Sequence, residues 1–256
     1  MTLRLAKRPG LLPLALGVLG LAAVVVLLPF LGDSDTLAGF VAAYVLVLLP
    51  TGSLLYGLLV LAADSPVPKL LFLGVVAGTV GVATTYLGGR PEKLVEGPAP
   101  EPLALLFFAD VLRMCAAACL GLALARRVTS PGVALLIAGL ATAADLFSVF
   151  AGPTRALVEK GVPALDYLLL IFPTFGYPLG FALGVADFIF LALFSAVAHR
   201  LEGLRPFITL SLGCAAVLLA MLVGLLLETA LPALPFIALS FILANATPLY
   251  RSLLSQ

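Results

Sequence analysis

The chain has 256 residues, of which 62% are hydrophobic and 11% charged, and its formal net charge is +1. Soluble domains carry about 25% charged residues, so this composition excludes an ordinary soluble globular domain. A net charge close to zero gives no reason to expect nucleic acid or another polyanion as a partner. The single histidine, His199, excludes a zinc protease of the His-Glu-x-x-His type, because that site needs two histidines.

Hydrophobic runs predict an all-helical polytopic membrane protein with about eight transmembrane helices. The first run follows basic residues, as in a signal peptide, but it is long enough to be interpreted as a span. The run 165–172 is too short to cross a bilayer, and we expect it to be a re-entrant or interfacial ninth segment. The eight expected spans are 11–31, 37–62, 70–87, 103–125, 132–151, 177–198, 206–227 and 231–249.

Basic residues in the short loops predict the orientation. With the amino terminus in the cytoplasm, nine of them lie inside (Arg4, Lys7, Arg8, Lys69, Arg126, Arg127, Arg200, Arg205 and Arg251) and four outside (Arg90, Lys93, Arg155 and Lys160). Both termini are then cytoplasmic, in the cytoplasmic (inner) membrane of a prokaryote. The run 37–62 contains a Pro-Thr-Gly sequence at Pro50, where a kink is expected.

Other polar residues in the apolar runs have a structural interpretation. Cys115 and Cys119 are one helical turn apart and are expected to be small buried hydrophobic residues, not ligands of a metal or a redox pair. Asn245 begins a glycosylation sequon by chance, inside an apolar run, and is expected to hydrogen-bond across helices. We expect no metal and no organic cofactor.

Most carboxylates near the apolar runs also have a local explanation. Asp110 has Arg113 three residues further along the same helix face, which predicts a self-contained structural ion pair. Asp166 and Glu228 are expected at the boundaries of spans, where water reaches them.

Asp145 and Asp187 are different, because each lies inside an apolar run with no basic residue within a helical turn. An ionised carboxylate in hydrocarbon costs several kcal/mol, so an intramembrane aspartate indicates function. The two expected spans are neighbours and run antiparallel. The aspartates lie about 9 and 15 Å from the same end, which allows the two carboxylates to face each other.

Two carboxylates held close share a proton. Such a pair can hydrolyse a peptide bond, one carboxylate taking a proton from water while the other donates to the carbonyl oxygen. A proton-coupled transporter would use the same carboxylates as a relay, and a purely structural pair would bond neighbouring helices. The aspartates alone leave the two functional interpretations open.

Three segments around the aspartates resemble the presenilin and signal peptide peptidase family of intramembrane aspartyl proteases. They are residues 145–150 (DLFSVF) with the presenilin-like continuation 152–159 (GPTRALVE), residues 183–190 (LGVADFIF), and residues 231–235 (LPALP). Their order is that of the family's first aspartate motif, its Gly-x-Gly-Asp motif and its Pro-Ala-Leu motif. The resemblance covers about residues 140–250.

The resemblance implies that Asp145 and Asp187 are the catalytic pair of an enzyme that cleaves transmembrane-helix substrates within the lipid bilayer. It also implies that Gly184 is the first glycine of the Gly-x-Gly-Asp motif. The segment formed by Pro232, Ala233 and Leu234 would pack beside the active site and hold unwound substrate. Residues 1–130 would then be scaffold helices and residues 131–256 catalytic helices of one membrane domain.

Three features depart from the family pattern. Ala144 stands where an aromatic residue usually precedes the first aspartate, Ala186 replaces the second glycine, and eight spans are counted instead of nine. The predicted orientation matches signal peptide peptidases and is opposite to that of presenilins. A catalytically silent relative that binds membrane helices as a scaffold is a further alternative to the protease and the transporter.

Overall fold

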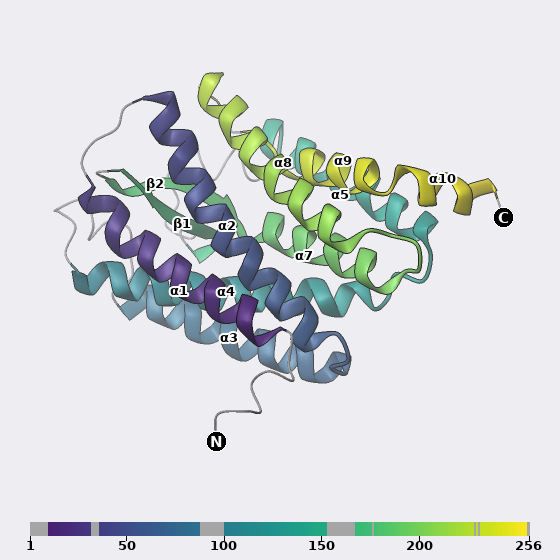
Figure 1. Ribbon diagram of the computed structural model, residues 1–256, viewed down its shortest axis with the longest axis horizontal. Coiled ribbons are helices and arrows are strands. Elements are labelled where there is room, and N and C mark those ends of the chain that lie inside the picture. The colour runs from purple at the N-terminus through teal and green to yellow at the C-terminus, as the bar shows by residue number, and fades with distance from the viewer. Residues whose placement is uncertain are drawn as a thin grey trace. The chain divides into compact units, whose positions relative to one another are not determined.

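The computed structural model describes residues 10–31, 36–87, 100–152, 167–175, 177–227, 229 and 231–254. Figure 1 shows that these residues form helices together with one two-stranded hairpin. The elements are α1 (Leu11–Leu27), the short helix η2 (Leu28–Phe30), α2 (Leu37–Ala62), α3 (Val67–Leu87), α4 (Pro100–Ala125), α5 (Pro131–Phe150), β1 (Leu169–Thr174), β2 (Tyr177–Gly184), α7 (Val185–Arg200), α8 (Pro206–Leu226), α9 (Leu234–Ala244) and α10 (Ala246–Leu254).

Six helices of the described residues are long and apolar enough to cross a membrane. They cover Leu11–Phe30, Leu37–Ala62, Val67–Tyr86, Ala104–Ala125, Pro131–Phe150 and Pro206–Leu226. Each has at least 20 residues, which at 1.5 Å per residue matches the roughly 30 Å of a hydrocarbon core. The predicted helical membrane architecture is therefore confirmed in class, whereas the count of eight spans is not.

The expected span 177–198 begins as a strand. Residues Tyr177–Gly184 form β2, which pairs antiparallel with β1, and α7 follows with 16 residues. Hydropathy predicted a helix here because the whole run is apolar. However, the strand residues include a proline and two glycines, which are poor helix formers, and β1 supplies the hydrogen-bonding partner that a strand needs. The short run expected to be re-entrant supplies part of that partner strand.

The expected span 231–249 is divided into two shorter helices. α9 has 11 residues, about 16 Å at 1.5 Å per residue, and Asn245 separates it from α10. Pro232 precedes α9, and Pro235 occupies its first turn, where the missing proline N–H is tolerated. The prolines thus set the start of α9 and leave it too short to cross the bilayer straight.

Local sequence explains where several long helices begin. Thr36 caps α2 by accepting a hydrogen bond from the Gly39 N–H (3.1 Å), and Ser130 caps α5 by accepting from the Val133 N–H (3.3 Å). α2 continues through Pro50, and the hydroxyl of the next residue, Thr51, donates to the Val47 carbonyl (2.8 Å). α2 is therefore one uninterrupted helix that includes Pro50.

Contacts divide the chain into two compact units. The first unit comprises Met1–Leu120 and Asp166–Phe188, and the second comprises Gly121–Leu165 and Ile189–Gln256. The two units alternate along the sequence. The functional division at residue 131 stays a prediction.

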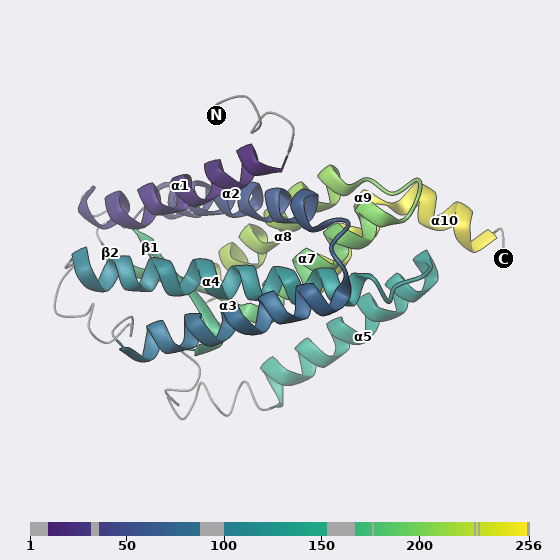
Figure 2. The ribbon, with the colours of Figure 1, turned by 90° about the horizontal axis from the view of Figure 1, so that it is seen from below.

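In the first unit, α1 packs along α2, and both ribbon views show the two helices side by side (Figures 1 and 2). Small residues allow this approach: a Cβ on Gly20 would lie 2.8 Å from Pro50 Cβ, and one on Gly57 would lie 2.5 Å from Leu14 N. Helices in membranes associate in this way because lipid provides no hydrophobic driving force between them. α3 approaches α4 closely at Gly74, where a Cβ would lie 3.2 Å from Cys119 Cβ.

In the second unit, α9 packs against both α8 and α5, and α10 contacts α5. The rings of Phe194 and Phe241 stack with centroids 4.9 Å apart, which fixes α7 against α9. Arg200, at the end of α7, donates a hydrogen bond to the carbonyl of Ala125, the last residue of α4. A cation at a helix carboxyl end satisfies a carbonyl that has no partner within its own helix.

Candidate active site

Asp145, the first of the two aspartates that the sequence singles out, is partly buried on α5, within the candidate span Pro131–Phe150. Its Oδ2 accepts a hydrogen bond from the Leu234 N–H, with an N···O distance of 3.1 Å. Leu234 is the first residue of α9 and lies 89 residues further along the chain. The first aspartate and the Pro-Ala-Leu segment are therefore in direct contact.

The start of α9 explains why a carboxylate lies there. The N-cap residue Ala233 has no side chain able to cap, and Pro235 has no N–H. The N–H groups of Phe236 and Ile237 both donate to the Ala233 carbonyl (3.1 Å each). The Leu234 N–H is the donor of the first turn that remains, and Asp145 acts as its cap from another helix. The positive end of the helix dipole further favours the ionised carboxylate.

Asp187, the second aspartate, lies in the first turn of α7, directly after β2. A Cβ added to Gly184 would lie 2.8 Å from Asp187 Oδ2, so the carboxylate occupies the space that a side chain at residue 184 would need. A side chain at residue 184 would therefore displace this carboxylate, which is the flexible end of the aspartate of the same motif. A carboxylate in a first helical turn is favoured by the helix dipole, as at Asp145.

The hairpin before Asp187 has a defined register. Leu169 lies opposite Gly184, and Ile171 lies opposite Ala182. The Val185 N–H donates to the Leu168 carbonyl (2.9 Å), which extends the ladder by one pair into the start of α7. The hairpin therefore leads directly into the turn that carries Asp187.

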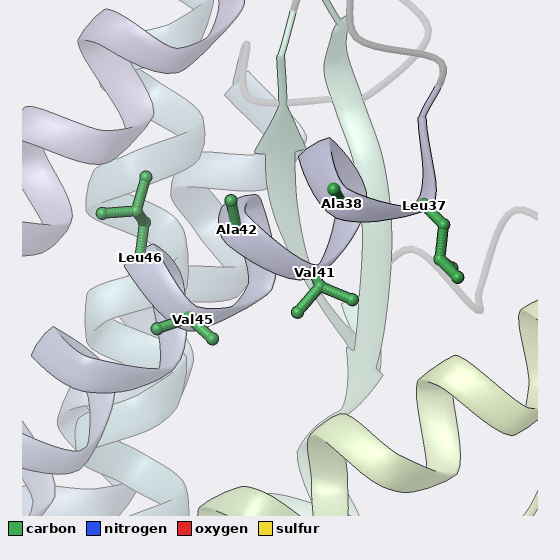
Figure 3. Close-up of a pocket in the computed structure, with 6 residues that line it drawn as sticks. All are labelled: Leu37, Ala38, Val41, Ala42, Val45 and Leu46. Carbon is green, nitrogen blue, oxygen red and sulfur yellow. The ribbon is translucent and has the colours of Figure 1, made fainter.

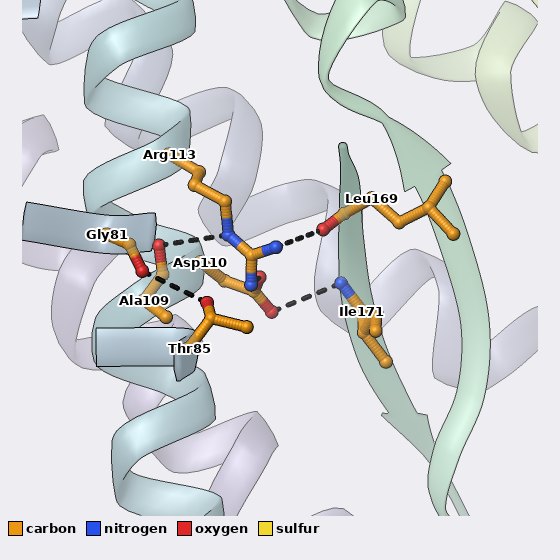
Figure 4. Close-up of polar contacts among 7 residues, drawn as sticks. All are labelled: Gly81, Thr85, Ala109, Asp110, Arg113, Leu169 and Ile171. Carbon is orange, nitrogen blue, oxygen red and sulfur yellow. Dashed lines mark hydrogen bonds and ion pairs between the residues drawn. The ribbon is translucent and has the colours of Figure 1, made fainter. Parts of the chain in front are cut away.

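The predicted ion pair between Asp110 and Arg113 is confirmed, with an Nη2···Oδ1 distance of 2.7 Å (Figure 4). The expectation that it is self-contained is wrong. Arg113 Nη1 also donates to the Leu169 carbonyl (2.6 Å), and Asp110 Oδ2 accepts from the Ile171 N–H (3.2 Å). The sequence shows the charged pair, but no residue pattern indicates that its other partners are backbone groups of a strand.

Asp145 belongs to the second unit and Asp187 to the first. The Asp145 carboxylate lies at the start of α9, which follows a proline. The Asp187 carboxylate lies in the first turn of α7, which follows a glycine. Ala144 and Ala186, which depart from the family pattern, are both exposed. Their methyl groups are therefore not packed into the core of either unit.

The expected structural role of Asn245 is confirmed. Its side chain is fully buried at the break between α9 and α10, and its Oδ1 accepts from the Arg205 N–H (2.8 Å) at the start of α8. Its Nδ2 donates to Thr209 Oγ1 (2.8 Å) and to the Phe241 carbonyl (2.9 Å). A fully buried amide is not accessible for glycosylation, so the sequon is fortuitous.

Other candidate groups do not form a site within the described residues. Cys115 and Cys119 are free and partly buried, and His199 is exposed at the end of α7. No cluster of three histidine, cysteine or acidic side chains that could hold a metal occurs in the described ranges. Asp166, Glu228 and residues 153–159 of the presenilin-like continuation lie outside them.

Figure 3 shows a shallow hollow on the first half of α2. It is lined by apolar residues only, namely Leu37, Ala38, Val41, Ala42, Val45 and Leu46. The absence of a polar group from this lining makes it unsuitable for acid–base chemistry. An apolar, exposed helix face of this kind suits contact with lipid chains.

Comparisons of this chain with protein-family models, with curated proteins and with solved structures find no match. The likeness to intramembrane aspartyl proteases is therefore carried by the residues of the three segments themselves.

Proposed function

We propose that this chain is an intramembrane aspartyl protease that hydrolyses peptide bonds within transmembrane segments, using Asp145, Asp187 and one water. The observation that carries the proposal is the hydrogen bond from the Leu234 N–H to Asp145. It joins the first aspartate to the Pro-Ala-Leu segment, two features that the sequence resemblance links only by analogy. The proposal assigns no role to a metal or an organic cofactor.

In the proposed reaction, the ionised carboxylate takes a proton from water, whose oxygen attacks the scissile carbonyl carbon. The protonated carboxyl gives its proton to the carbonyl oxygen, and a tetrahedral diol forms. When the C–N bond breaks, the first carboxyl returns its proton to the amine nitrogen and the second takes one from the diol. Both groups end in their starting states. The mechanism requires both aspartates to contact the same water.

Pro232, Ala233 and Leu234 have a second role in the proposal, which is to hold unwound substrate. A transmembrane helix shields its carbonyl groups by internal hydrogen bonds, so it must unwind locally before cleavage. A helix start interrupted by prolines offers backbone groups with which an extended peptide can pair. Gly184, which has no side chain, leaves the space that the Asp187 carboxylate occupies.

The first test is cleavage of a single-span reporter by the purified full-length protein in lipid. Asp145→Asn and Asp187→Asn each remove one proton-transfer group, so each is expected to lower kcat by about a hundredfold to ten-thousandfold. Asp64→Asn, at an exposed position between α2 and α3, is the matched control and should cleave like the wild type.

A kcat close to that of the wild type in either active-site variant would contradict the proposal. A wild-type protein that does not cleave would also contradict it, and proton flux across vesicles would then test the transporter alternative. Binding of the reporter without cleavage or flux would favour the silent scaffold.

A further inference from the structure

The Asp110–Arg113 pair lies inside the candidate span Ala104–Ala125, where it is almost completely buried. The exposed fractions of the two residues are 4% and 3%. Burying two charges costs several kcal/mol each, and well-packed apolar residues often replace such a pair without loss of stability. Packing alone therefore does not explain this pair.

The hydrogen bonds of the pair explain it better. Backbone groups of successive strand residues point to opposite edges of the strand. The Leu168 carbonyl accepts a hydrogen bond from the N–H of Val185, the residue directly after β2. Leu170 and Phe172 therefore face β2, whereas Leu169 and Ile171 present their backbone groups to the other edge of β1. Arg113 supplies the donor that the Leu169 carbonyl needs, and Asp110 supplies the acceptor that the Ile171 N–H needs (Figure 4).

A strand edge at membrane depth has no water to satisfy it, and each unpaired group costs several kcal/mol. The ion pair offers a donor where the strand presents an acceptor, and an acceptor where the strand presents a donor. An ion pair that stabilised only α4 would have no need of this match. Leu106, one helical turn before Asp110, also packs on Ile171, so the same face of α4 holds the strand by apolar contact.

The attachment continues to the candidate catalytic aspartate in two steps. Leu169, held by Arg113, is the register partner of Gly184. Gly184 in turn provides the space that the Asp187 carboxylate fills. A shift of β1 on α4 would move Gly184 and change the position of this carboxylate.

We propose that Asp110 and Arg113 are positioning residues: they fix β1 on α4 and thereby hold Asp187 in place for the reaction. This role rests on the proposed protease function. It predicts that loss of the strand contacts lowers kcat, while substrate binding and global stability change little.

The main variant is Asp110→Leu combined with Arg113→Met, which replaces the pair by apolar residues. We expect an unchanged or higher Tm, as for other buried ion pairs replaced in this way. Hydrogen exchange of residues 168–184 should be at least about tenfold faster, because the strand edge is no longer held. The kcat should fall by about a hundredfold, the usual effect of a displacement near 1 Å, with KM changed less than about threefold.

Two further variants isolate the strand contact from the charges. Arg113→Lys keeps a cation beside Asp110 but has no planar fork to reach the Leu169 carbonyl as well, so an intermediate loss of kcat is expected. Thr85→Val is the matched control, because the Thr85 hydroxyl donates to the Gly81 carbonyl of its own helix (3.0 Å) and does not bond β1. It should retain wild-type kcat.

A covalent link supplies the rescue that a merely structural role would not give. Leu106→Cys and Ile171→Cys, placed in a background with Cys115, Cys119 and Cys214 changed to alanine, are joined by a short bis-maleimide. The link should restore kcat of the apolar double variant to within about threefold of the linked wild type. The same protein without the linker should stay slow.

The outcomes separate the two proposals. Normal cleavage by the wild type together with unchanged kcat in the apolar double variant overturns the positioning role and leaves the protease function intact. A slow double variant that the link does not rescue also overturns the positioning role. A wild type that cannot cleave overturns the protease function and the positioning role with it.

Discussion

At the scale of single residues, space next to a carboxylate decides what Gly184 contributes. Among the described glycines, Gly203 has a positive φ and Gly184 does not. The restriction is the Asp187 oxygen 2.8 Å from where a Cβ would lie. A glycine at this position therefore leaves room for the Asp187 carboxylate. It does not serve to allow a special backbone conformation.

Gly184→Ala is expected to lower kcat by about a hundredfold, because the new methyl group forces the Asp187 carboxylate to move. The overall fold should persist, since an aspartate side chain can rotate away. Cleavage kinetics and Tm measure the two effects. Gly139→Ala is the matched control, because a Cβ there meets nothing within 4 Å. Wild-type kcat in Gly184→Ala would contradict the assignment.

Residue patterns predicted some contacts correctly and missed others. The spacing of Asp110 and Arg113 is enough to predict their ion pair, since residues three apart share a helix face. The bonds of the pair to Leu169 and Ile171 join residues 56 and 61 positions apart. Backbone groups occur at every residue, so no side-chain pattern marks the ones that a buried charge will bind.

At the scale of elements, the start of α9 is completed by a side chain from another helix. Its own N-cap is an alanine, and Asp145 of α5 accepts the remaining N–H of the first turn. Asp145 therefore has a structural role in addition to its proposed catalytic one. Substitutions that keep or remove its hydrogen-bond acceptor separate the two roles.

Asp145→Ala and Asp145→Asn should both lower kcat strongly but differ in stability. The asparagine oxygen can still accept from the Leu234 N–H, whereas alanine leaves this donor without a cap. Loss of a helix N-cap costs about 0.5–2 kcal/mol, so the alanine variant should unfold more easily by about that amount. Equilibrium unfolding in mixed detergent micelles, with Asp64→Ala as a surface control, measures the difference. Equal stabilities of the two variants would contradict the capping role.

The sequence predicted the wrong type of element for residues 177–184, which form a strand and not part of a helix. An apolar run bounded by prolines and glycines is compatible with a helix or a buried strand, and hydropathy does not distinguish them. Whether 177–184 forms a helix or a strand depends on pairing with β1. This segment lies close in the sequence, but its apolar run is too short to predict a span. The strand forms because each segment supplies the hydrogen-bonding groups that the other lacks.

At the scale of the whole molecule, orientation in the membrane is set by loop charge, and the contacts within each unit do not determine it. With eight alternating spans, nine basic residues on one side against four on the other predict that both termini are cytoplasmic. The start of α7, with Asp187, would then lie toward the extracytoplasmic side. Substrate helices with cytoplasmic amino termini are expected to be preferred, as the resemblance to signal peptide peptidases implies.

Reporter fusions test this orientation. A fusion after Gln256 and one near Asp64 should report the cytoplasm, whereas one near Lys160 should report the opposite side. The fusion at Asp64 serves as the internal control, because the same alternation places it inside. An extracytoplasmic signal from Gln256 would reverse the orientation and with it the expected substrate preference.

The sequence by itself determined the membrane class and six of the long helices, because these depend on composition or on residues within a few positions of one another. Only the tertiary structure decided that 177–184 is a strand, that Asp145 caps α9, and that the Asp110–Arg113 pair holds β1. The last two features join backbone groups to partners far away in the chain, and the strand pairs with a nearby segment that is too short to be recognised by itself. Whether a backbone group finds such a partner depends on which elements pack together, and local periodicity carries no information about that.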